Sequence, residues 1–177
     1  LRLFHLVSDH ISSVILLQHA LGIATAILLF LAVRRIGVPR WLGLAPAAIV
    51  LLGGTEIYVE HAALTEALYI FLLAGALYAA IRSVGSRSPE WAALAGALAG
   101  AAADVRFLGL VVVPTLVVWL FVARCGPLAG RALHAGLALL LASLIVGGYV
   151  YAQGQATGFT CITRAGMWNT YGRVAQF

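Results

Sequence analysis

The chain has 177 residues, of which 63% are hydrophobic and 10% are charged, and its formal net charge is +5. An average soluble domain carries roughly 25% charged residues, so this composition excludes a soluble globular domain. A positive net charge can indicate a nucleic-acid partner. Here the arginines fall between apolar runs rather than in one patch, so we expect a lipid bilayer as the partner and no nucleic acid.

Apolar runs rich in Leu, Ala and Val follow one another along the chain. A span needs about 20 apolar residues to cross a hydrocarbon core of about 30 Å. Because lipid offers the backbone no water, each run must satisfy its own hydrogen bonds as a helix, and the runs lack the alternation of barrel strands. The sequence predicts an all-α fold, a polytopic transmembrane helix bundle with about six spans near residues 11–33, 41–58, 62–81, 91–103, 107–123 and 132–151.

The fourth and fifth runs are unusual. The fourth has 13 residues and the fifth contains Pro114, so the two form either full crossings or a shallow re-entrant hairpin. Ala92, Gly96 and Gly100 repeat at every fourth position, which permits close approach of another helix but also arises by chance in alanine-rich helices. Residues 152–177 are polar and aromatic and predict the start of an extracytoplasmic segment.

The charges are distributed unequally between the two sides of the predicted bundle. Strict alternation of the spans places seven arginines on one side and four on the other. The positive-inside rule makes the richer side cytoplasmic. Acidic residues gather at the opposite, outer face. The use of arginine without lysine and the abundance of Ala and Gly are typical of a GC-rich bacterial genome, so we expect a bacterial plasma membrane.

Acidic side chains cluster at the outer ends of the second and third runs. The cluster contains Glu56, Glu60, His61 and Glu66, and a continued helix would place Glu56 and Glu60 on one face. Such a cluster can bind a cation, accept a proton from a hydroxyl group or position a polar head group. The alternative interpretation is a solvated loop in which Glu66 complements a helix dipole.

A second candidate site, Asp104 and Arg106, lies between the fourth and fifth runs. A buried Asp–Arg pair can be purely structural, because each charge offsets the desolvation of the other. An arginine at the outer membrane face can instead bind a phosphate through paired hydrogen bonds. The sequence is compatible with both the structural pair and the phosphate site.

Two histidines fall in or beside predicted spans. We expect His19, after Gln18 in the first span, to pack and to bond to a neighbouring helix, and His134 to lie at the cytoplasmic interface. The sequence contains no metal-ligand spacing such as C-x-x-C, no phosphate-binding glycine loop and no nucleophile elbow. It predicts no metal site and no cofactor, with a divalent cation as the open alternative.

Four stretches together resemble the polyprenyl-phosphate-dependent glycosyltransferases of the membrane-embedded C superfamily, particularly actinobacterial mannosyl- or arabinosyltransferase-like members. An acid-containing LTE segment opens a span, a basic loop and a small-residue helix follow, and an Arg-x-x-Gly-Leu turn completes the series. The order is preserved over roughly residues 11–123. The stretches are Leu16–Gly22, Arg34–Trp41, Glu60–Tyr69 and Val105–Leu110.

The resemblance implies a cell-envelope hexosyl- or pentosyltransferase that moves a sugar from a polyprenyl-phosphate carrier to an extracytoplasmic glycan, lipid or protein. In that family the base is an aspartate of the first outer loop. That loop is expected upstream of Leu1, so the chain is expected to be a fragment without it. The resemblance implies that Glu60 and Glu66 line the rim of the site and that Arg106 faces the carrier phosphate. Arg164 or Arg173 is a further candidate for contact with that phosphate.

Two other function classes stay open. A transporter or flippase segment should place polar groups at the midplane of two corresponding helices, whereas here they gather at the outer face. A structural membrane subunit would use Gly96 and Gly100 only for packing, and would tolerate the loss of Glu60, Glu66 and Arg106.

Overall fold

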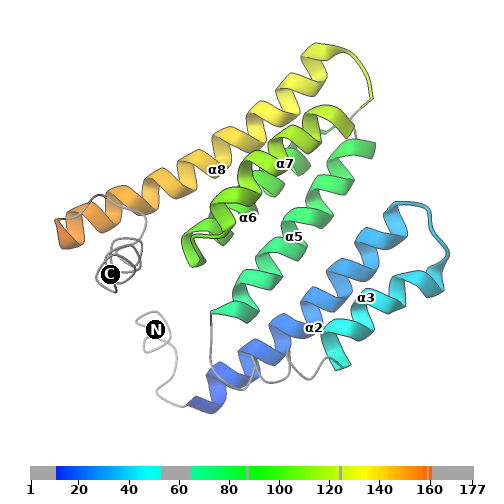
Figure 1. Ribbon diagram of the computed structural model, residues 1–177, viewed down its shortest axis with the longest axis horizontal. Coiled ribbons are helices and arrows are strands. Elements are labelled where there is room, and N and C mark those ends of the chain that lie inside the picture. The colour runs from blue at the N-terminus through cyan, green and yellow to red at the C-terminus, as the bar shows by residue number, and fades with distance from the viewer. Residues whose placement is uncertain (1–10, 53–64, 87, 124, 159, 161–177) are drawn as a thin grey trace, which may run out of the picture.

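The computed structural model describes residues 11–52, 65–86, 88–123, 125–158 and 160, with side chains from residue 15 onward. Within these residues the regular secondary structure is helical and contains no strand, which confirms the all-α fold class. The described helices are α2 (Ile11–Arg35), α3 (Arg40–Leu52), α5 (Glu66–Gly85), α6 (Glu90–Val105), α7 (Gly109–Ala123) and α8 (Leu128–Thr157) (Figure 1).

Three of the described helices are long and apolar enough to cross a membrane: α2 over Ile15–Arg35, α5 and α8. The helices α3 and α7 are apolar but shorter. At 1.5 Å per residue, the 16 residues of α6 and the 15 residues of α7 extend about 24 and 22 Å. Both values fall below the ~30 Å of a hydrocarbon core. The fourth and fifth predicted runs therefore form a helical hairpin shorter than that core.

Successive helices run antiparallel, and α6 lies among α5, α7 and α8 (Figure 1). The hairpin of α2 and α3 packs against α5 through α2. Most of the side chains that fill the core are alanines, which allow helix backbones to approach closely. They come from α5, α6, α7 and α8 and are Ala76, Ala79, Ala80, Ala92, Ala95, Ala99, Leu116, Leu120 and Ala138.

The small-residue repeat of α6 packs against α8. A Cβ atom added at Gly100 would lie 2.9 Å from the Cα atom of Ala142, and one added at Gly96 would collide with the carbonyl group of Ala138. Both glycines are buried. This contact confirms the interpretation of close helix approach, because only glycine leaves room for the neighbouring backbone.

Two features of α8 add to what the sequence predicts. The helix α8 continues to Thr157, six residues beyond the predicted end of the sixth span, and stops at Gly158, whose φ is 73°. His134, which the sequence predicts at the cytoplasmic interface, has a buried side chain that is 2% exposed. Its Nδ1 atom lies 2.8 Å from the Ser83 hydroxyl of α5, and polar side chains in membrane helices bond across the helix interface in this way.

We predict that Gly96→Ala destabilises the protein by about 1–3 kcal/mol, because the added methyl group overpacks the contact with α8. The matched control is Gly136→Ala on α8, where nothing lies within 4 Å of the new Cβ atom and a helical alanine is favoured by about 0.5–1 kcal/mol. Thermal unfolding of the full-length protein in detergent measures both. Equal melting temperatures would contradict the close packing of α6 on α8.

Candidate functional site

Because successive helices run antiparallel, the connections between them lie alternately at the two ends of the bundle. The start of α5 and the turn between α6 and α7 lie at one end, whereas the connections from α2 to α3, α5 to α6 and α7 to α8 lie at the other (Figure 1). We call these the acidic end and the arginine-rich end. The described arginines of the latter are Arg34, Arg35, Arg40, Arg82 and Arg131.

An ion pair joins two of these segments at the acidic end. The Nη1 atom of Arg106, in the turn after α6, donates a hydrogen bond to Oε1 of Glu66, the first residue of α5. The two side chains are 40% and 29% exposed. Ion pairs that remain in contact with solvent contribute roughly 0–1 kcal/mol to stability. This pair therefore orients Arg106, and we expect it to contribute little to folding.

The backbone around Arg106 is fixed on both sides. Its N–H group bonds to the carbonyl group of Ala102, 3.0 Å away, and its own carbonyl group accepts a 2.8 Å bond from Gly109. A Cβ atom at Gly109 would lie 2.6 Å from the Cα atom of Ala103. The tight turn thus requires glycine at position 109 and holds Arg106 at the end of the hairpin.

The structural pairing of Arg106 is with Glu66 and not with Asp104, which corrects the interpretation of an Asp104–Arg106 pair. Asp104 lies in the last turn of α6, beyond the apolar run 91–103. Its Oδ1 atom and the Oε2 atom of Glu66 are buried and have no hydrogen-bond partner among the described residues. An unsatisfied buried acceptor costs roughly 1–3 kcal/mol, so both atoms are suited to a ligand that brings hydroxyl donors.

The other candidate residues from the sequence divide into two groups. Gln18 is buried in α2, and the Nδ1 atom of His19 lies 3.0 Å from the carbonyl group of Ile15 in the same helix. No group of three or more His, Cys, Asp or Glu residues that could hold a metal ion occurs in the described part of the chain. The candidates that lie outside the described residues are Glu56, Glu60, His61, Arg164 and Arg173.

Sequence reasoning missed a polar cluster at the arginine-rich end. The guanidinium group of Arg82 lies 3.9 Å from the ring centroid of Trp91 and donates a 3.0 Å hydrogen bond to the hydroxyl group of Tyr78. Ser83, which follows Arg82 in α5, makes the hydrogen bond to His134 of α8. Strict alternation of the spans places the neighbouring Arg82 and Arg131 on one side of the membrane, and that was the signal available for this contact.

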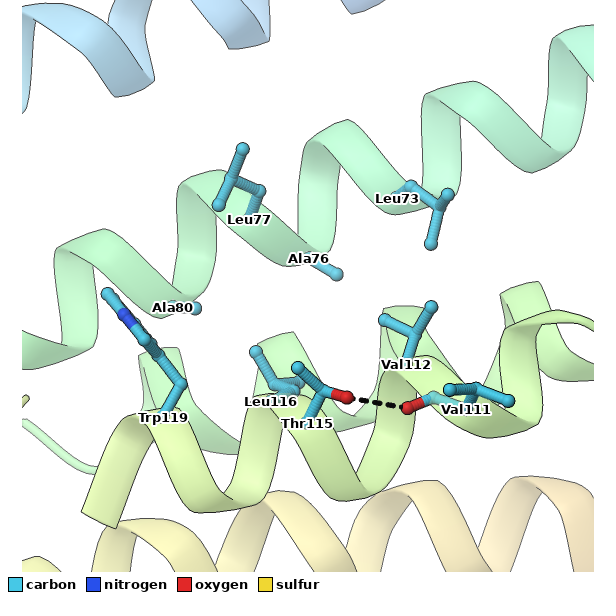
Figure 2. A pocket seen from close by; sticks show the side chains of 9 residues that line it. All are labelled: Leu73, Ala76, Leu77, Ala80, Val111, Val112, Thr115, Leu116 and Trp119. Carbon is cyan, nitrogen blue, oxygen red and sulfur yellow. Dashed lines mark hydrogen bonds between the residues drawn. The ribbon is translucent and has the colours of Figure 1, made fainter. Parts of the chain in front are cut away.

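Sequence reasoning also missed two apolar grooves that flank α7. The larger, about 440 Å³, lies between α5 and α7 (Figure 2). The smaller, about 350 Å³, lies between α7 and α8 and includes Pro114 and Ser143. We call them the α5/α7 groove and the α7/α8 groove. The α5/α7 groove is lined by Leu73, Ala76, Leu77, Ala80, Val111, Val112, Thr115, Leu116 and Trp119.

The bundle is built from apolar helices and has an ion pair at one of its ends. These features define an integral membrane protein of the all-α class. Residues 1–149 match the family of dolichyl-phosphate-mannose-protein mannosyltransferases, and the chain belongs to that family. It is thus a membrane glycosyltransferase of the mannosyltransferase type, which confirms the resemblance to the C superfamily at family level. No curated protein and no solved structure matches the chain. Family membership favours the transferase over the transporter and the structural subunit.

Proposed function

We propose that this protein transfers a sugar, a hexose or pentose, from a polyprenyl-phosphate carrier to a glycan, lipid or protein acceptor on the outer side of a bacterial plasma membrane. The observation that carries the proposal is the Glu66–Arg106 pair at one end of the bundle. The family supports it, because its description names a lipid-phosphate-linked mannose as donor. The actinobacterial type stays a prediction.

Arg106 is the group that we propose for the carrier phosphate. A guanidinium group has five N–H donors in a planar fork, and one N–H of Arg106 bonds to Glu66. The remaining donors can bind phosphate oxygens in the paired geometry that arginine favours. When the bond between the sugar carbon and the phosphate oxygen breaks, its electron pair stays on that oxygen. The positive charge of Arg106 then stabilises the departing phosphate.

Glu66 and Asp104 are proposed to bind the sugar. Each has a buried carboxylate oxygen without a donor among the described residues, and sugar hydroxyl groups supply such donors. The acceptor hydroxyl must lose its proton to a carboxylate base as it attacks the sugar carbon. The family resemblance assigns that base to an aspartate of the first outer loop. Glu60, with Glu56 and His61 beside it, is proposed to form the rim of the site.

The distribution of charge supports an extracytoplasmic site. The connections at the arginine-rich end lie opposite Glu66 and Arg106 (Figure 1), and loops rich in arginine stay in the cytoplasm. The sugar, the acceptor and the chain length of the carrier are left open by this proposal.

We predict that Arg106→Ala lowers sugar transfer at least about a hundredfold, comparable to the removal of one charge-stabilising donor elsewhere. The full-length protein in membranes is assayed with radiolabelled polyprenyl-phosphate sugars, and Glu66→Gln is measured beside it. Arg131→Ala, at the arginine-rich end, removes one positive charge from the same protein and is expected to retain transfer. Because the ion pair is partly exposed, melting temperatures of the Arg106 and Glu66 variants should stay close to wild type.

Undiminished transfer in folded Arg106→Ala would remove this residue from the site. A folded wild-type protein that transfers sugar from no polyprenyl-phosphate donor would overturn the proposed function itself. The transporter and the structural subunit would then become the leading interpretations.

We propose that transfer requires no resident cofactor and no metal ion. Treatment of the membranes with EDTA, followed by buffer without metal, is therefore expected to leave transfer unchanged. A loss of activity that Mg²⁺ or Mn²⁺ restores would instead support a divalent cation at the cluster of Glu56, Glu60 and His61, since carboxylate oxygens suit such hard ions.

A further inference from the structure

The α5/α7 groove leads away from the ion pair along the same two helices that position it. On α7 its lining begins at Val111, two residues after the helix starts at Gly109, and ends at Trp119. At 1.5 Å per residue this stretch covers about 12 Å. On α5 the lining begins at Leu73, two turns after Glu66. One end of the groove is therefore close in the chain to Arg106 and Glu66.

The surface of the groove is apolar in its contacts as well as in its composition. Its single hydroxyl group, on Thr115, bonds to the carbonyl group of Val111 in its own helix, 2.8 Å away. Figure 2 shows this bond on the wall formed by α7. Ala76 and Ala80 on α5 are fully buried small residues that leave the space open. Branched or linear hydrocarbon matches this lining, in which the remaining polar group is the indole N–H of Trp119.

We propose that the α5/α7 groove holds the isoprenoid chain of the lipid carrier while Arg106 holds its phosphate. This inference rests on the proposed function and assigns the tail-binding part of that site. The carrier combines one hydrocarbon chain with one phosphate, and the α5/α7 helix pair combines one apolar groove with one arginine at its end. The α7/α8 groove also begins near Arg106, at Leu110, but α8 brings no charged residue to the acidic end. The helix α5 begins with Glu66, which orients Arg106, and this favours the α5/α7 groove.

We expect the groove to select which isoprenoid chain fits. We expect it to contribute little to the affinity for the carrier. The isoprenoid chain moves into the groove from lipid and not from water, so no hydrophobic driving force accompanies the transfer and only packing contributes. The phosphate bond to Arg106 should thus dominate affinity. A residue that blocks the groove should raise KM several-fold for a long-chain donor and leave a short, two-isoprene donor unaffected.

The test uses Val111→Trp in the full-length protein reconstituted into phosphatidylglycerol vesicles. Val111 lines the groove and is 65% exposed, and the matched control Val118→Trp changes a 62% exposed valine of the same helix that lies outside the lining. Kinetics are measured with a long-chain and a two-isoprene polyprenyl-phosphate sugar. A KM increase confined to Val111→Trp and to the long donor supports the inference, and equal effects at both positions or with both donors overturn it.

A second measurement is independent of catalysis. A photoreactive phenylalanine analogue at position 111 is illuminated in vesicles that contain radiolabelled long-chain polyprenyl phosphate, with the same analogue at position 118 as control. Labelling at 111 that excess unlabelled polyprenyl phosphate abolishes supports the inference. Labelling that excess phosphatidylglycerol abolishes equally indicates ordinary membrane lipid. Cross-links to another helix of the protein indicate a covered face, and either result overturns the inference.

The two measurements separate failure of the inference from failure of the proposed function. Sugar transfer without competed labelling at 111 would refute the groove and keep the transferase. Competed labelling at 111 without any sugar transfer would keep the groove as a site for the lipid and refute the transferase.

Discussion

The close contact of α6 with its neighbours is the constraint on which the arrangement of the site depends. The buried face of α6 consists of alanine and glycine, and Gly96 and Gly100 leave room for the α8 backbone. Between membrane helices there is no hydrophobic driving force, so packing of this kind and interhelical hydrogen bonds hold the bundle. A bulkier α6 would move away from α5 and α8. The turn that carries Arg106 would move with it, away from Glu66.

The short α6–α7 hairpin holds Asp104 and Arg106 at its closed end. Its two helices, at about 24 and 22 Å, are shorter than the hydrocarbon core. Gly109 then closes the turn tightly enough to hold Arg106 on the carbonyl group of Ala102.

Much of this fold could be predicted from the sequence because apolar runs and arginines follow simple physical rules. The helical class, the order of the runs and the candidates Glu66, Asp104 and Arg106 all came from length, hydropathy and charge. The partner of Arg106 could not be predicted, since Glu66 lies 40 residues away in the chain and Asp104 was nearer. The burial of His134 could not be predicted, because hydropathy indicates only how deep a residue lies in the membrane. It does not indicate whether the side chain faces lipid or another helix.

The exposure of the Glu66–Arg106 pair bears on how it can act. A deeply buried pair resists separation, because either charge left alone loses several kcal/mol of compensation. Here both side chains remain partly exposed, so the pair costs little to rearrange. The carboxylate of Glu66 offsets the charge of Arg106. In the proposed function a phosphate that shared the guanidinium group would bring a negative charge toward Glu66, and a sugar hydroxyl that donated to Oε2 would relieve that repulsion. The sugar-loaded carrier should accordingly fit this site better than the bare lipid phosphate.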